Sequence, residues 1–143
     1  MPKVIKVSEA ASLAIHAMVL LATRPEKVFS TKEIASILHA SKAHLSKVLQ
    51  RLARCGLVKS NRGPKGGFML AKSIEEITLL EVYEAIEGPL LASECLLNTP
   101  LCGGRKCIFG QLLENAGQRF RDYMASTKLS EVTDVFKREE AYA

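Results

Sequence analysis

The stretch STKEIASILHASKAHLSKVLQRLARCG, residues 30–56, carries the signals of two short helices joined by a tight turn. Ser30 and Glu33 form a capping box at its start, and Ser41 is a suitable N-cap for a second helix. Gly56 stands where a left-handed residue commonly closes a helix. Apolar residues of the second helix recur on one stripe: Leu45, Val48, Leu49 and Leu52. This pattern predicts a helix-turn-helix unit.

A short hairpin is expected directly after this unit, because the hydrophobic period changes at Gly56. Residues 57–60 and 68–70 have the composition of two strands, and NRGPKGG, residues 61–67, lies between them. A basic loop rich in Gly and Pro between two strands is typical of a wing. We expect its glycines to let the backbone approach a phosphate closely, while Arg62 and Lys65 supply positive charge.

Two flanking helices complete the predicted domain. Ser8 caps a helix that runs to about Thr23, and Thr78 with Glu81 forms a second capping box before a helix that closes at Gly88. Together these elements predict a mainly α fold with a small β-hairpin wing, a winged helix-turn-helix domain within residues 1–88. Two polar side chains of this domain, His16 and Cys55, have apolar neighbours in the sequence, which favours burial of both.

Charge is distributed unevenly over the chain. The 143 residues are 48% hydrophobic and 24% charged, which suits one soluble domain. Residues 1–72 hold 13 Lys/Arg against 3 Asp/Glu, a net +10, whereas residues 73–143 hold 7 against 12, a net −5. A basic first half indicates a polyanionic partner, and nucleic acid is the commonest. No apolar run is long enough to span a membrane, so we expect a cytoplasmic protein.

The polar face of the second helix is the expected DNA-reading surface. No carboxylate occurs from Ser41 to Arg62, although a solvated helix face usually mixes charges. The residues predicted to contact double-stranded operator DNA are Ser41, Lys42, His44, Lys47, Arg51, Arg62 and Lys65. Enzymatic activity is not expected, because the sequence offers no nucleophile with a base at recognisable spacing and no cofactor loop.

A long helix is predicted from Ile108 onward, and residues 108–143 are expected to form a dimerisation helix and tail. Its apolar residues are Phe109, Leu112, Leu113, Ala116, Phe120 and Tyr123. A second copy of the chain is the expected partner, since DNA-binding proteins of this size usually read two half-sites. The alternative is that the helix folds back on its own domain. Residues 131–143 are expected to form a weak terminal helix and a polar tail.

Three cysteines lie in the connecting segment, residues 89–107. Cys95, Cys102 and Cys107 fall within 13 residues and lack the close pairs typical of structural zinc sites. Three thiolates with a fourth ligand from elsewhere favour an iron–sulfur cluster. A redox-active thiol group, or ordinary loop cysteines, are the alternatives.

Taken together, these motifs resemble the Rrf-two family of bacterial winged-helix regulators over nearly the whole chain. The matching stretches are residues 45–52, 56–58, 62–68, 77–82 and 87–88, followed by the three cysteines. The resemblance implies a homodimer that crosses its long helices and places each recognition helix in a major groove. It further implies that Arg62 reaches a minor groove and that Cys95, Cys102 and Cys107 are cluster ligands.

The fourth cluster ligand is where this sequence departs from the family patterns. IscR-like members place a His three residues after the last cysteine, where Gly110 stands here. NsrR-like members use an acid near the start of the first helix, often from the partner subunit; the matching position is Ser12, with Glu9 one helical turn earlier. Another member uses a His before the recognition helix, where His39 stands. The sequence is therefore compatible with either a 2Fe–2S or a 4Fe–4S cluster.

The sequence thus predicts a DNA-binding transcription regulator, expected to be a repressor. Its operator affinity would be controlled by an iron–sulfur cluster that senses redox state, nitric oxide or iron–sulfur status. The alternative is a cluster-free regulator of the same family, controlled by thiol oxidation or by a protein partner.

Overall fold

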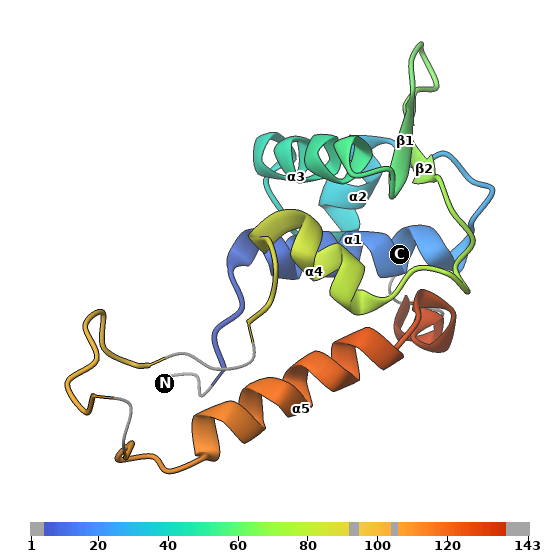
Figure 1. Cartoon of the computed structure of the whole chain (residues 1–143). Helices are drawn as coiled ribbons and strands as arrows, with labels where there is room; N and C mark the ends of the chain where they lie inside the picture. Colours follow the sequence, from blue (N-terminus) through green and yellow to red (C-terminus); the bar gives the residue numbers. More distant parts are fainter. Residues whose placement is uncertain (1–4, 92–94, 104–105, 137–143) are drawn as a thin grey trace.

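The computed structural model describes residues 5–91, 95–103 and 106–136. These residues form a mainly helical fold with one antiparallel hairpin, as predicted (Figure 1). The regular elements are α1 (Glu9–Thr23), α2 (Thr31–Leu38), α3 (Lys42–Arg54), β1 (Val58–Asn61), β2 (Gly67–Leu70), α4 (Leu79–Glu87) and α5 (Leu112–Ser126). Two short 3-10 helices follow, Leu129–Glu131 and Thr133–Phe136. No helix among the described residues is long and apolar enough to cross a membrane.

All four predicted N-caps of the winged domain are formed. The cap oxygen accepts a backbone hydrogen bond three residues on, in the pairs Ser8–Ala11, Ser30–Glu33, Ser41–His44 and Thr78–Glu81. Each bond satisfies an N–H that the first helical turn leaves without an intrahelical partner. The helix starts are therefore specified by residues within one turn of each other.

The core is built around α1. Its buried residues come from nearly all sides of the helix, because α2, α3, α4, β2 and the 3-10 helices all pack on it. The recognition helix α3 contributes its predicted stripe, in which Leu45, Leu49 and Leu52 are fully buried. Burial of a large aliphatic side chain stabilises the fold by about 1.5–3 kcal/mol. This packing holds α3 against the domain with its polar face outward.

Two predictions about burial in this domain are wrong. The side chain of His16 is exposed, and its Nδ1 donates to the carbonyl oxygen of Ser12 at 2.6 Å. Cys55 is also exposed at the C-terminal end of α3, with its Sγ 3.9 Å from the carbonyl oxygen of Ala85. His16 lies on the one uncovered side of α1, whereas Cys55 lies in an exposed turn, residues 54–56, that ends α3; apolar sequence neighbours reveal neither position.

The two strands of the hairpin pair with each other, and the hairpin is also hydrogen-bonded to the residues just before α2. Its strands pair in a register that runs from Val58↔Leu70 to Asn61↔Gly67. An additional bridge links Phe29 and Phe68, whose backbone groups exchange hydrogen bonds of 2.9 and 2.8 Å. The base of the wing is thus held next to the N-terminus of α2.

The C-terminal region differs from its prediction in two respects. Helix α5 begins at Leu112 rather than at Ile108, because a turn with Gly110 at φ 61° precedes it. The weak terminal helix predicted from residue 131 is replaced by two short 3-10 helices that begin at Leu129 and pack on α1, with Leu129 and Thr133 buried. The rest of the predicted tail, residues 137–143, lies outside the described residues.

Candidate DNA-binding surface and cysteine segment

Helix α3 presents a basic surface opposite its buried stripe. Lys42, Lys47 and Arg51 are exposed, whereas His44 in the first turn is only partly exposed. The hydroxyl of Ser41 accepts from the His44 N–H at 3.3 Å, so its oxygen is already engaged as a cap. Each predicted contact of this helix therefore lies on the accessible side of the domain, and the lysines and arginine are free to meet a polyanion.

One carboxylate enters this surface from another element. Glu9, the first residue of α1, places its Oε1 3.9 Å from Nδ1 of His44. The absence of acids between Ser41 and Arg62 in the sequence did not reveal this neighbour, because the two residues are brought together only by the packing of α1 on α3.

The wing carries the other predicted DNA contacts, Arg62 and Lys65, and both side chains are exposed. The approach of its glycines to a phosphate stays a prediction, but Gly66 and Gly67 also have a structural role. A Cβ on Gly67 would lie 2.0 Å from the carbonyl oxygen of Phe29, and a Cβ on Gly66 would lie 2.5 Å from that of Asn61. These two glycines allow close approach of protein backbone to protein backbone, which sets the position of the wing.

The cysteine segment contains no helix or strand in its described parts, residues 89–91, 95–103 and 106–107. Cys95 and Cys102 are exposed and Cys107 is partly exposed, and all three thiols are free. The Sγ of Cys95 lies 3.5 Å from the N–H of Leu97, within hydrogen-bonding range for sulfur. Among the described residues, no three Cys, His, Asp or Glu side chains gather closely enough to hold a metal ion.

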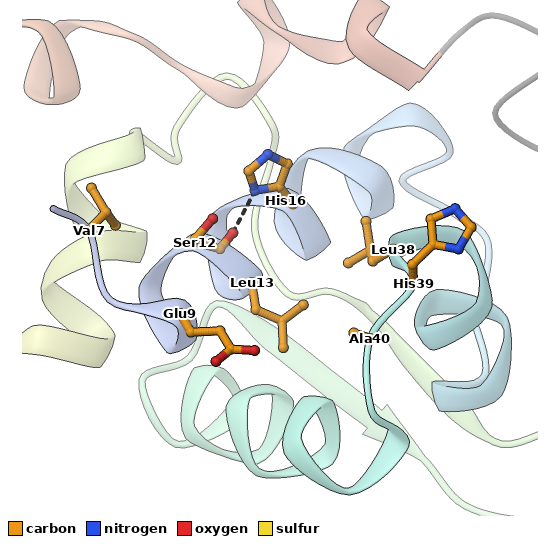
Figure 2. A pocket seen from close by; sticks show the side chains of 8 residues that line it. All are labelled: Val7, Glu9, Ser12, Leu13, His16, Leu38, His39 and Ala40. Carbon is orange, nitrogen blue, oxygen red and sulfur yellow. Dashed lines mark hydrogen bonds between the residues drawn. The ribbon is translucent and has the colours of Figure 1, made fainter. Parts of the chain in front are cut away.

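The three candidates for a fourth ligand line the same cavity. Glu9, Ser12 and His39 border a pocket of about 570 Å³ between the first turns of α1 and the end of α2, and His16 borders it as well (Figure 2). His39 adopts a left-handed conformation, φ 52°, and closes α2 as its C-cap. The fold therefore brings together oxygen and nitrogen donors that are up to 30 residues apart in the sequence.

The apolar residues predicted for dimerisation divide between two sides of α5. Leu113 and Phe120 are only partly exposed, and the Phe120 ring meets Tyr83 of α4 edge-on, with centroids 5.9 Å apart. Leu112 is 61% exposed and Tyr123 59% exposed. Ala116 is exposed too, and Phe109, 45% exposed, lies in the turn before the helix. One side of α5 thus packs on its own domain and the other is uncovered.

The polar contacts of α5 strengthen its attachment to α4. Arg121 donates from Nη1 to the carbonyl oxygen of Leu90 at 2.8 Å and lies 3.9 Å from Oε2 of Glu84. The same carboxylate oxygen accepts from the N–H of Leu90 at 2.8 Å. This arrangement holds the chain where it leaves the winged domain toward the cysteine segment.

A three-helix core with a basic recognition helix and a basic wing defines a winged helix-turn-helix DNA-binding protein. The family model for Rrf2, described as iron-dependent transcriptional regulators, matches residues 7–135. The chain belongs to the Rrf2 family and is a DNA-binding transcription regulator.

Individual relatives agree with this assignment. YwgB of Bacillus subtilis, named as an HTH-type transcriptional regulator, is 31% identical over 124 residues, 85% of this chain and 80% of that protein. The regulator IscR of Pectobacterium carotovorum is 33% identical over 107 residues, which are 71% of this chain and 65% of IscR. The solved structure of CymR, the global cysteine regulator of B. subtilis, is similar with a TM-score of 0.74 and 25% identity, covering 92% of this chain and 98% of CymR.

Proposed function

We propose that this regulator binds operator DNA as a homodimer and that its affinity is controlled by an iron–sulfur cluster at the cysteine segment. The observation that carries this proposal is the donor set. Cys95, Cys102 and Cys107 are free, solvent-accessible thiols within 13 residues of one another. No regular hydrogen-bonded element constrains the described backbone around them, so their segment is suited to wrap a ligand.

The chemistry of these donors fits the group. Thiolates are the ordinary ligands of iron–sulfur clusters, and three of them leave one iron position for a donor of another kind. When bound, such a cluster supplies a redox-active group that oxygen or nitric oxide can oxidise or destroy. The protein's own contribution is to present three thiols from a single segment beside the helix that supports the dimer.

For the fourth donor we propose a residue of the cavity that Glu9, Ser12 and His39 line. A carboxylate, hydroxyl or imidazole at this position would hold the cluster less tightly than a fourth thiolate, which suits a sensor. Two observations support this cavity as the source of the fourth donor. It is open to solvent, and Glu9, which lines it, also lies beside His44 of the DNA-reading surface. Either subunit of a dimer is a possible source of this donor.

The dimer is proposed to form through the uncovered side of α5. Leu112, Ala116 and Tyr123 lie on that side, and Ile108, 97% exposed, and Phe109 precede it. Soluble proteins rarely leave several large apolar side chains uncovered on one surface unless a partner covers them. A second copy is the occupant that explains this surface, since a palindromic operator requires two recognition helices about 34–36 Å apart.

On DNA, each α3 is proposed to lie in a major groove with His44 near the base edges. Lys42, Lys47 and Arg51 would meet phosphates, Arg62 would enter the adjacent minor groove, and Lys65 would add a phosphate contact. This arrangement follows from the winged helix-turn-helix geometry, in which the recognition helix reads bases and the backbone contacts position it.

The cluster is tested with anaerobically prepared protein that has been reconstituted with iron and sulfide. We expect stoichiometric iron and sulfide, a visible absorption band and a Mössbauer spectrum that distinguishes 2Fe–2S from 4Fe–4S. Alanine at Cys95, Cys102 or Cys107 should abolish the chromophore, whereas Cys55→Ala should leave it intact as the matched control. Protein that holds no stoichiometric iron under these conditions contradicts the proposal.

A second candidate function is thiol-based control without a cluster. Two observations favour it: the described cysteines are not gathered into a metal-ready group, and the structurally similar CymR is named a cysteine regulator. Iron-free protein should then change its DNA affinity on treatment with a thiol oxidant, and this change should disappear in the triple Cys95, Cys102, Cys107 alanine variant. Iron-free protein whose affinity is insensitive to oxidant rules this candidate out.

A further inference from the structure

A second cavity lies where α2, α3 and the wing meet. Its volume is about 460 Å³. Its lining includes the polar and basic residues Thr31, Lys32, Lys42, Ser60, Asn61 and Arg62. The three cationic residues come from three different elements, so the fold rather than the sequence brings them around one space. Lys32 is not part of the recognition helix and was not among the predicted DNA contacts.

The walls of this cavity are held in place by the backbone. The paired hydrogen bonds between Phe29 and Phe68 attach β2 to the residues that precede α2. Gly67 makes this attachment possible, because any Cβ there would overlap the Phe29 carbonyl group. The wing therefore does not have to close on a ligand to form the cavity; its base already stands beside α2 (Figure 1).

The surroundings of the cavity favour an anion. Between Lys27 and Ile74 the chain contains a single carboxylate, that of Glu33. Its Oε2 lies 3.0 Å from Nζ of Lys27, and its side chain is not part of the cavity lining. The neighbouring acid is thus already neutralised by another lysine, which leaves Lys32, Lys42 and Arg62 to set the local charge.

The position of the cavity identifies which anion is present during DNA binding. If α3 lies in a major groove and the wing in the adjacent minor groove, the sugar–phosphate strand that separates the two grooves must pass between α3 and the wing. The cavity occupies that place. We propose that it binds one backbone phosphate of the operator, with Lys32 and Lys42 as its cationic contacts. This inference rests on the DNA-docking arrangement proposed above.

The experiment uses the full chain and a labelled duplex of mixed sequence, about 30 base pairs long, because phosphate contacts do not depend on base sequence. Affinity is measured by fluorescence anisotropy between about 50 and 200 mM salt. One phosphate contact contributes about 0.9 to the slope of log affinity against log salt. A fourfold rise in salt concentration weakens the affinity of the parent protein by some factor. In a variant that lacks this contact, that factor should be about 3.5-fold smaller.

We expect the double variant Lys32→Ala/Lys42→Ala to lose about 0.9 of slope, the value of one shared phosphate. Each single variant should lose less, since the remaining lysine still meets the phosphate, and Lys32→Arg should keep the parental slope. The matched control is Lys128→Ala, which removes the same charge beyond α5. Both target lysines are exposed, so thermal unfolding should confirm that the variants remain folded.

Three outcomes overturn the proposal. A double variant with the parental slope means that no phosphate occupies the cavity. If the double variant loses about 1.8 of slope and each single variant loses half of that, the two lysines contact two separate phosphates. A loss fully reproduced by Lys42→Ala alone means that Lys32 makes no contact. Failure of the parent protein to bind any duplex is a different result, because it contradicts DNA binding itself rather than this site.

Discussion

The carboxylate of Glu9 lies beside the imidazole of His44, with Oε1 and Nδ1 3.9 Å apart. One of these residues starts α1 and lines the cavity of the proposed fourth ligand; the other is in the first turn of the recognition helix. A single side chain therefore connects the proposed sensing site with the DNA-reading surface. Engagement of Glu9 by a ligand would withdraw a negative charge from the neighbourhood of His44.

Replacing Glu9 by Gln in iron-free protein should strengthen DNA binding. The substitution removes a negative charge that faces the phosphate-binding side of the domain, while keeping the size of the side chain. Because Glu9 is well exposed, we expect an increase of only about 1.4- to 5-fold at low salt, the range of a surface charge interaction. Anisotropy titrations with a mixed-sequence duplex measure it, and Glu76→Gln, an exposed acid on another segment, serves as the control. Equal affinities for parent and Glu9→Gln would show that the carboxylate does not influence binding.

Gly67→Ala should destabilise the domain and weaken DNA binding together. The new Cβ would overlap the Phe29 carbonyl group, so the bridge that attaches the wing to α2 must open or shift. Overpacking of this kind costs about 1–3 kcal/mol. Thermal and urea unfolding measure the loss, with Ser60→Ala in the neighbouring strand as a control for an exposed wing substitution. A variant as stable as the parent would mean that the bridge adds little to the fold.

The two sides of α5 should respond differently to substitution. Leu112→Asp or Tyr123→Asp places a charge on the uncovered side, so we expect monomers whose winged domain unfolds at the parental temperature. Phe120→Ala instead removes the ring that meets Tyr83 and should lower the stability of the subunit by about 1–3 kcal/mol.

Sedimentation analysis combined with thermal unfolding separates these effects. A dimer that survives both aspartate substitutions would move the interface away from the uncovered side of α5. Monomers produced by Phe120→Ala without loss of subunit stability would assign that ring to the interface rather than to its own domain.

The pair formed by Lys27 and Glu33 predicts a pH dependence. The hydrogen bond from the Lys27 side chain holds the pKa of Glu33 below its usual value. A carboxyl with a lowered pKa in the folded state stabilises the fold above its unfolded pKa, and the contribution is lost as the pH falls through the folded pKa. Parent protein should therefore exceed Glu33→Gln in stability at neutral pH, by no more than about 0.5 kcal/mol because both side chains are partly solvated.

Urea unfolding at neutral pH and well below pH 4 tests this expectation. The difference between parent and Glu33→Gln should shrink toward zero in acid, where the protonated carboxyl resembles the amide. Glu26→Gln, an exposed acid in the preceding turn, should show no comparable difference. A gap between parent and Glu33→Gln that persists unchanged at low pH would contradict an ionic origin.

Several features of the fold were predictable because they depend on residues within one helical turn. Ser30 caps α2 by accepting from Glu33, and Gly56 provides the left-handed residue after α3; both interactions are local. The apolar stripe of α3 is also local, since the helical period alone places Leu45 and Leu49 on one face. Boundaries were less accurate near turns: a turn at Gly110 delays the start of α5, and the hairpin strands include Asn61 and Gly67, which were predicted to lie in the loop.

Contacts between distant segments required the tertiary structure. His16 was expected in the core because apolar residues surround it in the sequence, yet the six elements that pack on α1 leave its side of the helix uncovered. For the same reason the sequence predicts Leu113 and Tyr123 on one dimerisation stripe, whereas in the structure Leu113 is partly covered beside α4 and Tyr123 lies on the uncovered face of α5. Helical spacing specifies which residues share a face but not what that face meets.

By itself the sequence determined the starts of α1, α2, α3 and α4, the wing, the basic character of the DNA-reading surface and the three cysteines close in sequence, because each depends on local spacing or composition. Only the tertiary structure decided that Glu9 meets His44, that Glu9, Ser12 and His39 share one cavity, and that Lys32 joins Lys42 beside the wing. These groupings join residues from separate elements. They arise from the burial of apolar faces around α1, which positions polar side chains that have no direct relationship along the chain.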